Sequence, residues 1–181
     1  MLCPKNKKID VTGGIMVVLS LNEIKGKIQL HPEVWVHMHT TNCYAYALGL
    51  DISENKICLN AYQPGIMSKV VDSLSDFSYD LLLRGIESDF DRLDIKHREV
   101  LPDEKISDDE WKIALLTEKI DGKLTDFHFL RQFSDGKWFH KYGYYGKICD
   151  RDCLDRVILN PVDSEWDSFR YDKCYALRIN R

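Results

Sequence analysis

The chain changes its sequence pattern near the middle, and this change constrains the fold more than any other feature. Up to about residue 93, apolar residues recur at helical spacing. Beyond residue 110, short aromatic or β-branched runs alternate with Gly, Asp and Asn, which is typical of strands and tight turns. Helical segments followed by strands predict an α+β fold, with N-terminal helices packed on a C-terminal antiparallel sheet.

Two segments of the first half carry the helical pattern. Residues 42–50 (NCYAYALGL) are rich in Ala and Leu, begin with the capping residue Asn42 and end near Gly49, so we expect a short capped helix. After the Gln-Pro-Gly turn at 63–65, the apolar residues of Met67 to Leu93 keep helical spacing. This stretch predicts one or two amphipathic helices, with Gly85 as the candidate break.

The second half predicts a sheet. Asp94 to Glu110 is charged, contains a proline and lacks a period, so we expect a surface connection. The predicted strands follow it at Trp111 to Thr117, Asp126 to Gln132, Lys137 to Tyr142, Arg156 to Leu159 and Cys174 to Ile179.

Length and composition favour one ordinary globular domain over residues 1–181, with residues 1–32 as a candidate N-terminal extension. The chain is 44% hydrophobic and 30% charged, which is typical of a soluble protein. A net charge of -4 without a clustered basic face argues against binding of nucleic acid.

No membrane association is expected either. The apolar run at 14–21 is too short for a membrane span, and polar residues stand where a signal peptide would need its cleavage site. We therefore expect the protein in the cytoplasm of the producing cell, or exported or injected without a classical signal peptide.

The six cysteines are too few and too irregularly spaced for a disulfide framework, which favours a reducing compartment. Cys149 and Cys153 form a C-x3-C pair, but no second Cys or His pair lies near enough in sequence to complete a zinc site. We expect neither a metal nor another cofactor.

Cys43 stands out because it directly follows Asn42, in what should be the first turn of a helix. Free N–H groups and the positive end of the helix dipole favour an anion there, and a thiolate is such an anion. The same N–H groups would stabilise the oxyanion of a tetrahedral intermediate. The alternative is a buried structural cysteine, as most free cysteines are.

Two histidines on a predicted hairpin supply the partners that a nucleophilic cysteine needs. With a three-residue connection around Gly136, Phe133 pairs with Lys137 and Leu130 lies opposite His140, so that His128 and His140 share one face. A two-residue turn would shift the register by one and place the histidines on opposite faces. In the first register, His128 would be the base and His140 the group that orients it.

In order along the chain, NCYAYAL, the Gln-Pro-Gly turn, DFHFLRQ, SDG and WFHK followed by a glycine resemble a bacterial branch of the papain-like superfamily. Its relatives include the NlpC/P60 and CHAP amidases and peptidases. The resemblance spans about Asn42 to Pro161. It implies a papain-like catalytic domain in which Cys43 is the nucleophile, His128 the base and His140 the third residue.

The sequence departs from that family pattern in places. Asn42 stands where NlpC/P60 enzymes usually carry Asp, and we expect it to support the site. Asn160 and Asp126 are alternatives for the third position, and Gln29 is the available residue for the oxyanion.

The resemblance implies a cysteine hydrolase that cleaves an amide in a peptide, in peptidoglycan or in a protein, through an acyl-enzyme. Two alternatives remain open. A transglutaminase or deamidase effector would use the same fold with another acceptor or substrate. A non-catalytic interaction module would use the scaffold alone.

Overall fold

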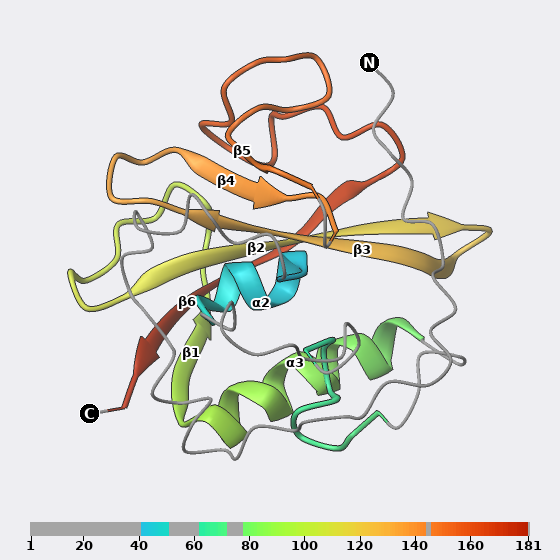
Figure 1. Ribbon diagram of the computed structural model, residues 1–181, viewed down its shortest axis with the longest axis vertical. Coiled ribbons are helices and arrows are strands. Elements are labelled where there is room, and N and C mark those ends of the chain that lie inside the picture. Colours follow the sequence, from blue (N-terminus) through green and yellow to red (C-terminus); the bar gives the residue numbers. More distant parts are fainter. Residues whose placement is uncertain (1–40, 51–61, 72–77, 144–145, 181) are drawn as a thin grey trace.

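The computed structural model describes residues 41–50, 62–71, 78–143 and 146–180. In these residues, two helices accompany one antiparallel sheet, so the predicted mixture of α and β structure is confirmed (Figure 1). The strands stand in the order β1-β6-β2-β3-β4-β5. Their bounds are β1 Ile95–Glu99, β2 Trp111–Ile120, β3 Lys123–Gln132, β4 Trp138–Lys141, β5 Ile148–Cys149 and β6 Arg170–Ile179.

Helix α2 (Cys43–Leu48) has the ends that the sequence predicts. The Asn42 side chain accepts a hydrogen bond from the N–H of Ala45 at 2.7 Å, and Gly49 closes the helix with a left-handed φ of 78°. All six residues of α2 are buried. A helix this short is marginal alone, so its place depends on packing.

Helix α3 (Tyr79–Leu93) is continuous, and the predicted break at Gly85 is wrong. Gly85 instead lets the 63–65 turn approach the helix, because a Cβ at Gly85 would lie 2.9 Å from the Cα of Gly65. Beside this contact, the buried Asp89 carboxylate accepts the N–H groups of Gly65 and Ser68, each at 2.7 Å. The glycine is therefore a docking position and not a helix end.

The expected surface connection at 94–110 is wrong in part, because it contains β1. This strand pairs with β6 at the edge of the sheet, and Ile95 is its one buried residue. Its other residues are mostly charged, so the sequence lacks the apolar alternation that predicts a strand. The predicted strand at 156–159 is also wrong: Val157 forms a single bridge with Arg151. The remaining predicted strands are present with shifted ends.

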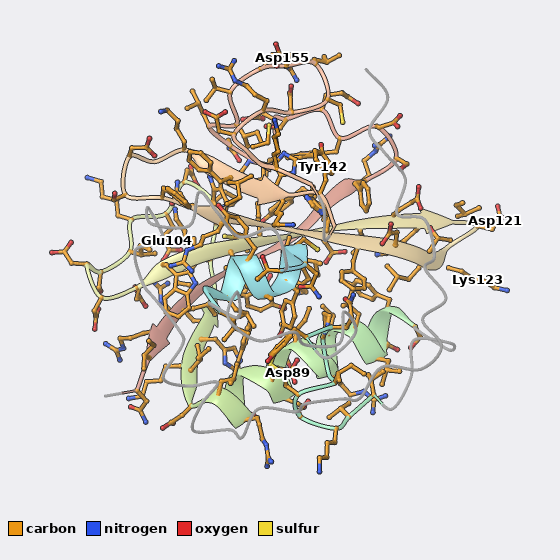
Figure 2. All side chains as sticks on the ribbon, viewed as in Figure 1. Asp89, Glu104, Asp121, Lys123, Tyr142 and Asp155 are labelled. Carbon is orange, nitrogen blue, oxygen red and sulfur yellow. The ribbon has the colours of Figure 1, made fainter. Side chains whose placement is uncertain are left out.

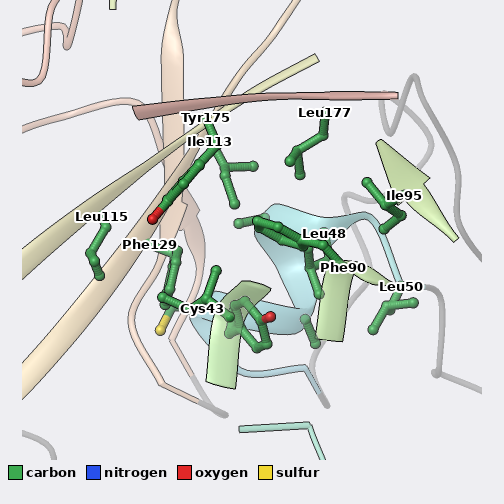
Figure 3. Packing of buried hydrophobic residues seen from close by; sticks show 14 of the residues in the cluster. Cys43, Leu48, Leu50, Phe90, Ile95, Ile113, Leu115, Phe129, Tyr175 and Leu177 are labelled. Atoms are coloured by element: carbon green, nitrogen blue, oxygen red, sulfur yellow. The ribbon is translucent and has the colours of Figure 1, made fainter. Parts of the chain in front are cut away.

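The sheet separates two apolar clusters. Figure 1 shows α2 and α3 on the same side of the sheet, and their residues pack with alternate side chains of the strands, among them Ile113, Leu115 and Phe129 (Figure 3). The intervening residues Leu116 and Leu130 belong to the second cluster, on the other side. We call these sides the helix face and the far face.

The C-terminal end of α2 is held by two strands. The indole N–H of Trp111 on β2 and the Arg131 guanidinium on β3 both donate to the carbonyl oxygen of Ala47, at 3.2 and 3.3 Å. Arg131 also stacks over the Trp111 ring. These contacts fix the helix, and hence Cys43 at its first residue, against β3.

Candidate active site

The hairpin between β3 and β4 has the three-residue connection that places both histidines on one face. The N–H of Phe133 donates to the Lys137 carbonyl at 2.9 Å, Gly136 has a φ of +83°, and Leu130 pairs with His140. The predicted register is confirmed. Because Leu130 and Leu116, the cross-strand partner of His128, are in the far cluster, the histidines lie on the far face.

His128 and His140 form a direct hydrogen bond. The Nε2 atom of His128 lies 2.9 Å from the Nδ1 atom of His140, and the Nε2 atom of His140 lies 2.9 Å from the carbonyl oxygen of Arg151. Tyr142, labelled in Figure 2, stacks on the His128 ring with an interplanar angle of 14°. Phe169 contacts the same imidazole, so the His128 ring is fixed on several sides.

These contacts determine which nitrogens carry hydrogen when both rings are neutral. A carbonyl oxygen only accepts, so Nε2 of His140 must donate to Arg151. Nδ1 of His140 is then an acceptor, and Nε2 of His128 donates to it. The remaining nitrogen, Nδ1 of His128, therefore keeps a lone pair that can accept a proton.

Burial keeps both histidines neutral. Desolvation lowers the pKa of His128 well below its ordinary value, and the nearby His140 lowers it further. Desolvation also lowers the pKa of His140 to about 4. At neutral pH the pair is thus in the form that accepts a proton, as a general base requires.

Cys43 lies at the edge of the helix-face cluster, beside Phe129 (Figure 3). The backbone N–H groups of Phe129 and Tyr44 lie near its sulfur and act to lower the pKa of the thiol. Phe129 directly follows His128, and it lies just beyond Leu130, where the pairing of β3 with β4 ends. The thiol therefore approaches β3 at its edge, one residue from the predicted base.

The sequence-based expectation of a thiolate at Cys43 is corrected by its burial. The residue is only 7% exposed, and desolvation raises the pKa of its thiol to about 12, although the N–H groups of Phe129 and Tyr44 and the charge of Lys141 act in the opposite direction. In this structure the thiol on the helix face and the two imidazoles on the far face are all neutral. The free energy required to remove a thiolate from water exceeds the stabilisation that a few nearby N–H groups supply.

The structure brings His128 and His140 into direct contact and places Cys43 beside the backbone of Phe129. Cys43 and His128 are not hydrogen bonded to each other in the described part of the chain. Asn42 supports the site as the helix cap, with its amide donating to the Tyr62 carbonyl at 3.0 Å. Gln29 and the segment 1–32 lie outside the described residues.

Of the candidates for the third position, His140 is the one that contacts His128. Asn160 uses its side-chain oxygen to accept the N–H of Val162 within its own loop. Asp126 on β3 acts on Cys43 rather than on the imidazoles, since its negative charge raises the pKa of the thiol.

Sequence reasoning missed three participants: Arg151, Tyr142 and Lys141. The carbonyl of Arg151 carries no side-chain signal and could not be found from sequence. Tyr142 ends the predicted strand Lys137 to Tyr142, but its sequence context indicates no role in the site. The available signal for Lys141 was its position directly after His140 in a predicted strand. Side chains alternate along a strand, so this position predicts a lysine on the helix face.

Within the described residues, no three His, Cys, Asp or Glu side chains lie close enough together to hold a metal ion. The described helices include none that is long and apolar enough to cross a membrane.

Comparisons of the chain with protein-family models, with curated proteins and with solved structures found no match.

Proposed function

We propose that this protein is a papain-like cysteine hydrolase, in which Cys43 attacks the carbonyl of an amide and His128 acts as the base. One observation carries the proposal: the hydrogen bonds from His128 through His140 to Arg151 leave the lone pair on Nδ1 of His128. Cys43 packs with the residue after His128, Phe129, in the helix-face cluster. Cys43 lies in the helix-face cluster and the two imidazoles lie on the far face, so the proposed proton transfer requires the sulfur to reach Nδ1 of His128 at the edge of β3, beyond Leu130, where the pairing with β4 ends.

In the proposed reaction, the thiol proton moves to Nδ1 of His128 as the sulfur attacks the carbonyl carbon. The imidazolium that forms is stabilised by its Nε2–H bond to His140. It then protonates the leaving amine, and the C–N bond breaks to give a thioester at Cys43. Water attacks the thioester with His128 again as base, which releases the acid and restores the thiol.

Because the thiol and the imidazoles are neutral at rest, the proposed reaction constrains when the proton is transferred. A thiol with a pKa near 12 does not form a stable ion pair with an imidazole whose pKa is lowered. Proton transfer must therefore accompany the attack, as in serine hydrolases, instead of preceding it. Substrate binding must also move whatever covers the sulfur, since Cys43 is nearly inaccessible.

A generic acyl donor tests the proposal without knowledge of the substrate. With 4-nitrophenyl acetate we expect a burst of nitrophenolate and an acetyl group on Cys43, detected by peptide mass spectrometry. Cys43→Ser should remove the acetylated peptide, and His128→Ala should slow the burst by about 10²-fold. Cys174→Ser is the matched control, because Cys174 is also buried and its thiol pKa is also raised to about 12.

One observation favours a non-catalytic interaction module as the second candidate: the thiol is buried and protonated at rest. Equal bursts in the wild type, Cys43→Ser and Cys174→Ser would establish this candidate and end the hydrolase proposal. If Cys43 is acetylated, a labelled primary amine added with casein then separates hydrolysis from transglutamination, because only a transferase incorporates the label into protein.

A further inference from the structure

A buried lysine lies on the opposite face of β4 from His140. Lys141 is the last residue of β4, and its side chain is fully buried, which is rare for a lysine. His140 points to the far face, so alternation turns Lys141 to the helix face. Phe139, two residues earlier, packs against Tyr46 of α2 and confirms this orientation.

The Lys141 ammonium is held near the end of its own strand. Its Nζ donates to the carbonyl oxygen of Gly143 at 2.6 Å, and Gly143 adopts a left-handed φ of 54°. The neighbouring residue His140 pairs with Leu130, so β4 carries Lys141 toward Phe129, which packs with Cys43 in the helix-face cluster. The lysine therefore reaches the same edge of β3 as the thiol.

Two charges of opposite sign act on the Cys43 sulfur from neighbouring strands. Desolvation is the largest effect on the thiol pKa; of the two charges, the negative charge of Asp126 on β3 disfavours the thiolate, and the positive charge of Lys141 on β4 favours it to a smaller extent. The nearby histidines are neutral and add no charge at rest. Lys141 is thus the cation that acts on the sulfur among the described residues.

We propose that Lys141 is a positioning residue that stabilises the negative charge on the Cys43 sulfur while the thiol proton passes to His128. This inference rests on the proposed function. Lys141 neither gives nor takes a proton in this step: the S–H bond breaks, an N–H bond forms at Nδ1 of His128, and the ammonium remains bound to Gly143. A buried charge acts strongly because water does not screen it.

The charge of Lys141 can itself be lost near neutral pH, because desolvation lowers the pKa of its ammonium to about 8. Its effect on Cys43 should therefore be complete below pH 7 and should decline as the pH rises past 8. A lysine that merely fills space would show no such decline.

The test is the rate of iodoacetamide alkylation at Cys43 from pH 6 to 9.5, read by peptide mass spectrometry, with Cys149 in the same digest as the internal reference. We expect Lys141→Met to slow alkylation of Cys43 at pH 7 by about tenfold, the factor for one pKa unit. The ratio of wild-type to variant rates should fall above pH 8. Lys141→Arg should keep the wild-type rate within about threefold, since it retains the charge.

Asp126→Asn is the control of opposite sign and should accelerate alkylation of Cys43. Circular dichroism shows whether each variant is folded, and Lys141→Arg keeps the test informative if Lys141→Met is not. Equal rates for the wild type, Lys141→Met and Lys141→Arg at every pH would overturn the inference. The acetylation burst with His128→Ala is scored separately, so failure of the hydrolase proposal is distinguishable from failure of the role of Lys141.

Discussion

A neutral histidine acts as a base only where one ring nitrogen has a lone pair to offer, and the contacts of that ring decide which nitrogen it is. For His128 the decision comes from His140 and, one bond further, from the Arg151 carbonyl. Burial supplies the other condition by keeping both rings unprotonated. The proton-accepting form of His128 is thus prepared by its neighbours and not by its own position in the sequence.

Replacement of His140 tests this arrangement. We expect His140→Ala to leave Nε2–H of His128 without an acceptor, to lower the free energy of unfolding by about 1 to 3 kcal/mol, and to slow the acetylation burst by at least about tenfold. His140→Asn should recover part of the rate, because its side-chain oxygen can accept from His128. Equal burst rates in both variants would show that His140 is only a packing residue.

At the scale of elements, contacts at both ends of α2 position the thiol. Helix α2 is anchored at its C-terminal end by Trp111 and Arg131, while the 63–65 turn docks on α3 through Gly85 and Asp89. The turn meets α2 as well, because the Asn42 amide donates to the Tyr62 carbonyl. The first residue of α2 is therefore located by contacts with β2, β3 and the turn beside α3.

Gly85→Ala tests the docking of the turn. Alanine is the better helix former by about 1 kcal/mol, yet its Cβ would lie 2.9 Å from Gly65 Cα and 3.0 Å from Gly65 N, and backbone atoms cannot move aside cheaply. We expect the free energy of unfolding in urea to fall by about 1 to 3 kcal/mol. Glu87→Ala, at an exposed position of the same helix, should change it by less than about 0.5 kcal/mol. A stabilised Gly85→Ala variant would contradict the close contact.

At the scale of the molecule, the far face is covered by the loop between β5 and β6, which delivers the Arg151 carbonyl to His140. Asp152 organises this loop by accepting two hydrogen bonds from the Arg156 guanidinium and one each from the N–H groups of Leu154, Arg156 and Glu165. Trp166, near the end of the loop, packs its ring against His140. The positions of the His128 and His140 imidazoles therefore depend on a segment that follows them in the sequence.

Asp152→Asn should loosen this loop. Burial by itself raises the pKa of Asp152, but Arg156 and the surrounding N–H groups lower it to about 2. Because the folded-state pKa is depressed, the carboxylate contributes stability above the unfolded value of about 3.9, and that stability is lost as the pH falls toward 2. We expect the variant to be less stable at pH 7, with the difference from wild type shrinking between pH 4 and 2. Hydrogen exchange over residues 150–165 at pH 7 should be faster in the variant; unchanged exchange would show that Asp152 does not hold the loop.

Local sequence determined the elements whose signals are local. Asn42 and Gly49 set the ends of α2, and Gly136 set the hairpin register that brings His128 to His140. Only the tertiary structure decided the rest. Gly85 became a docking position, and β1 became a strand, because of partners distant in sequence. The thiol of Cys43 became protonated because burial outweighs the N–H groups around it. The physical reason is that turns and caps are satisfied within a few residues, whereas desolvation and strand pairing depend on what the whole chain packs against a group.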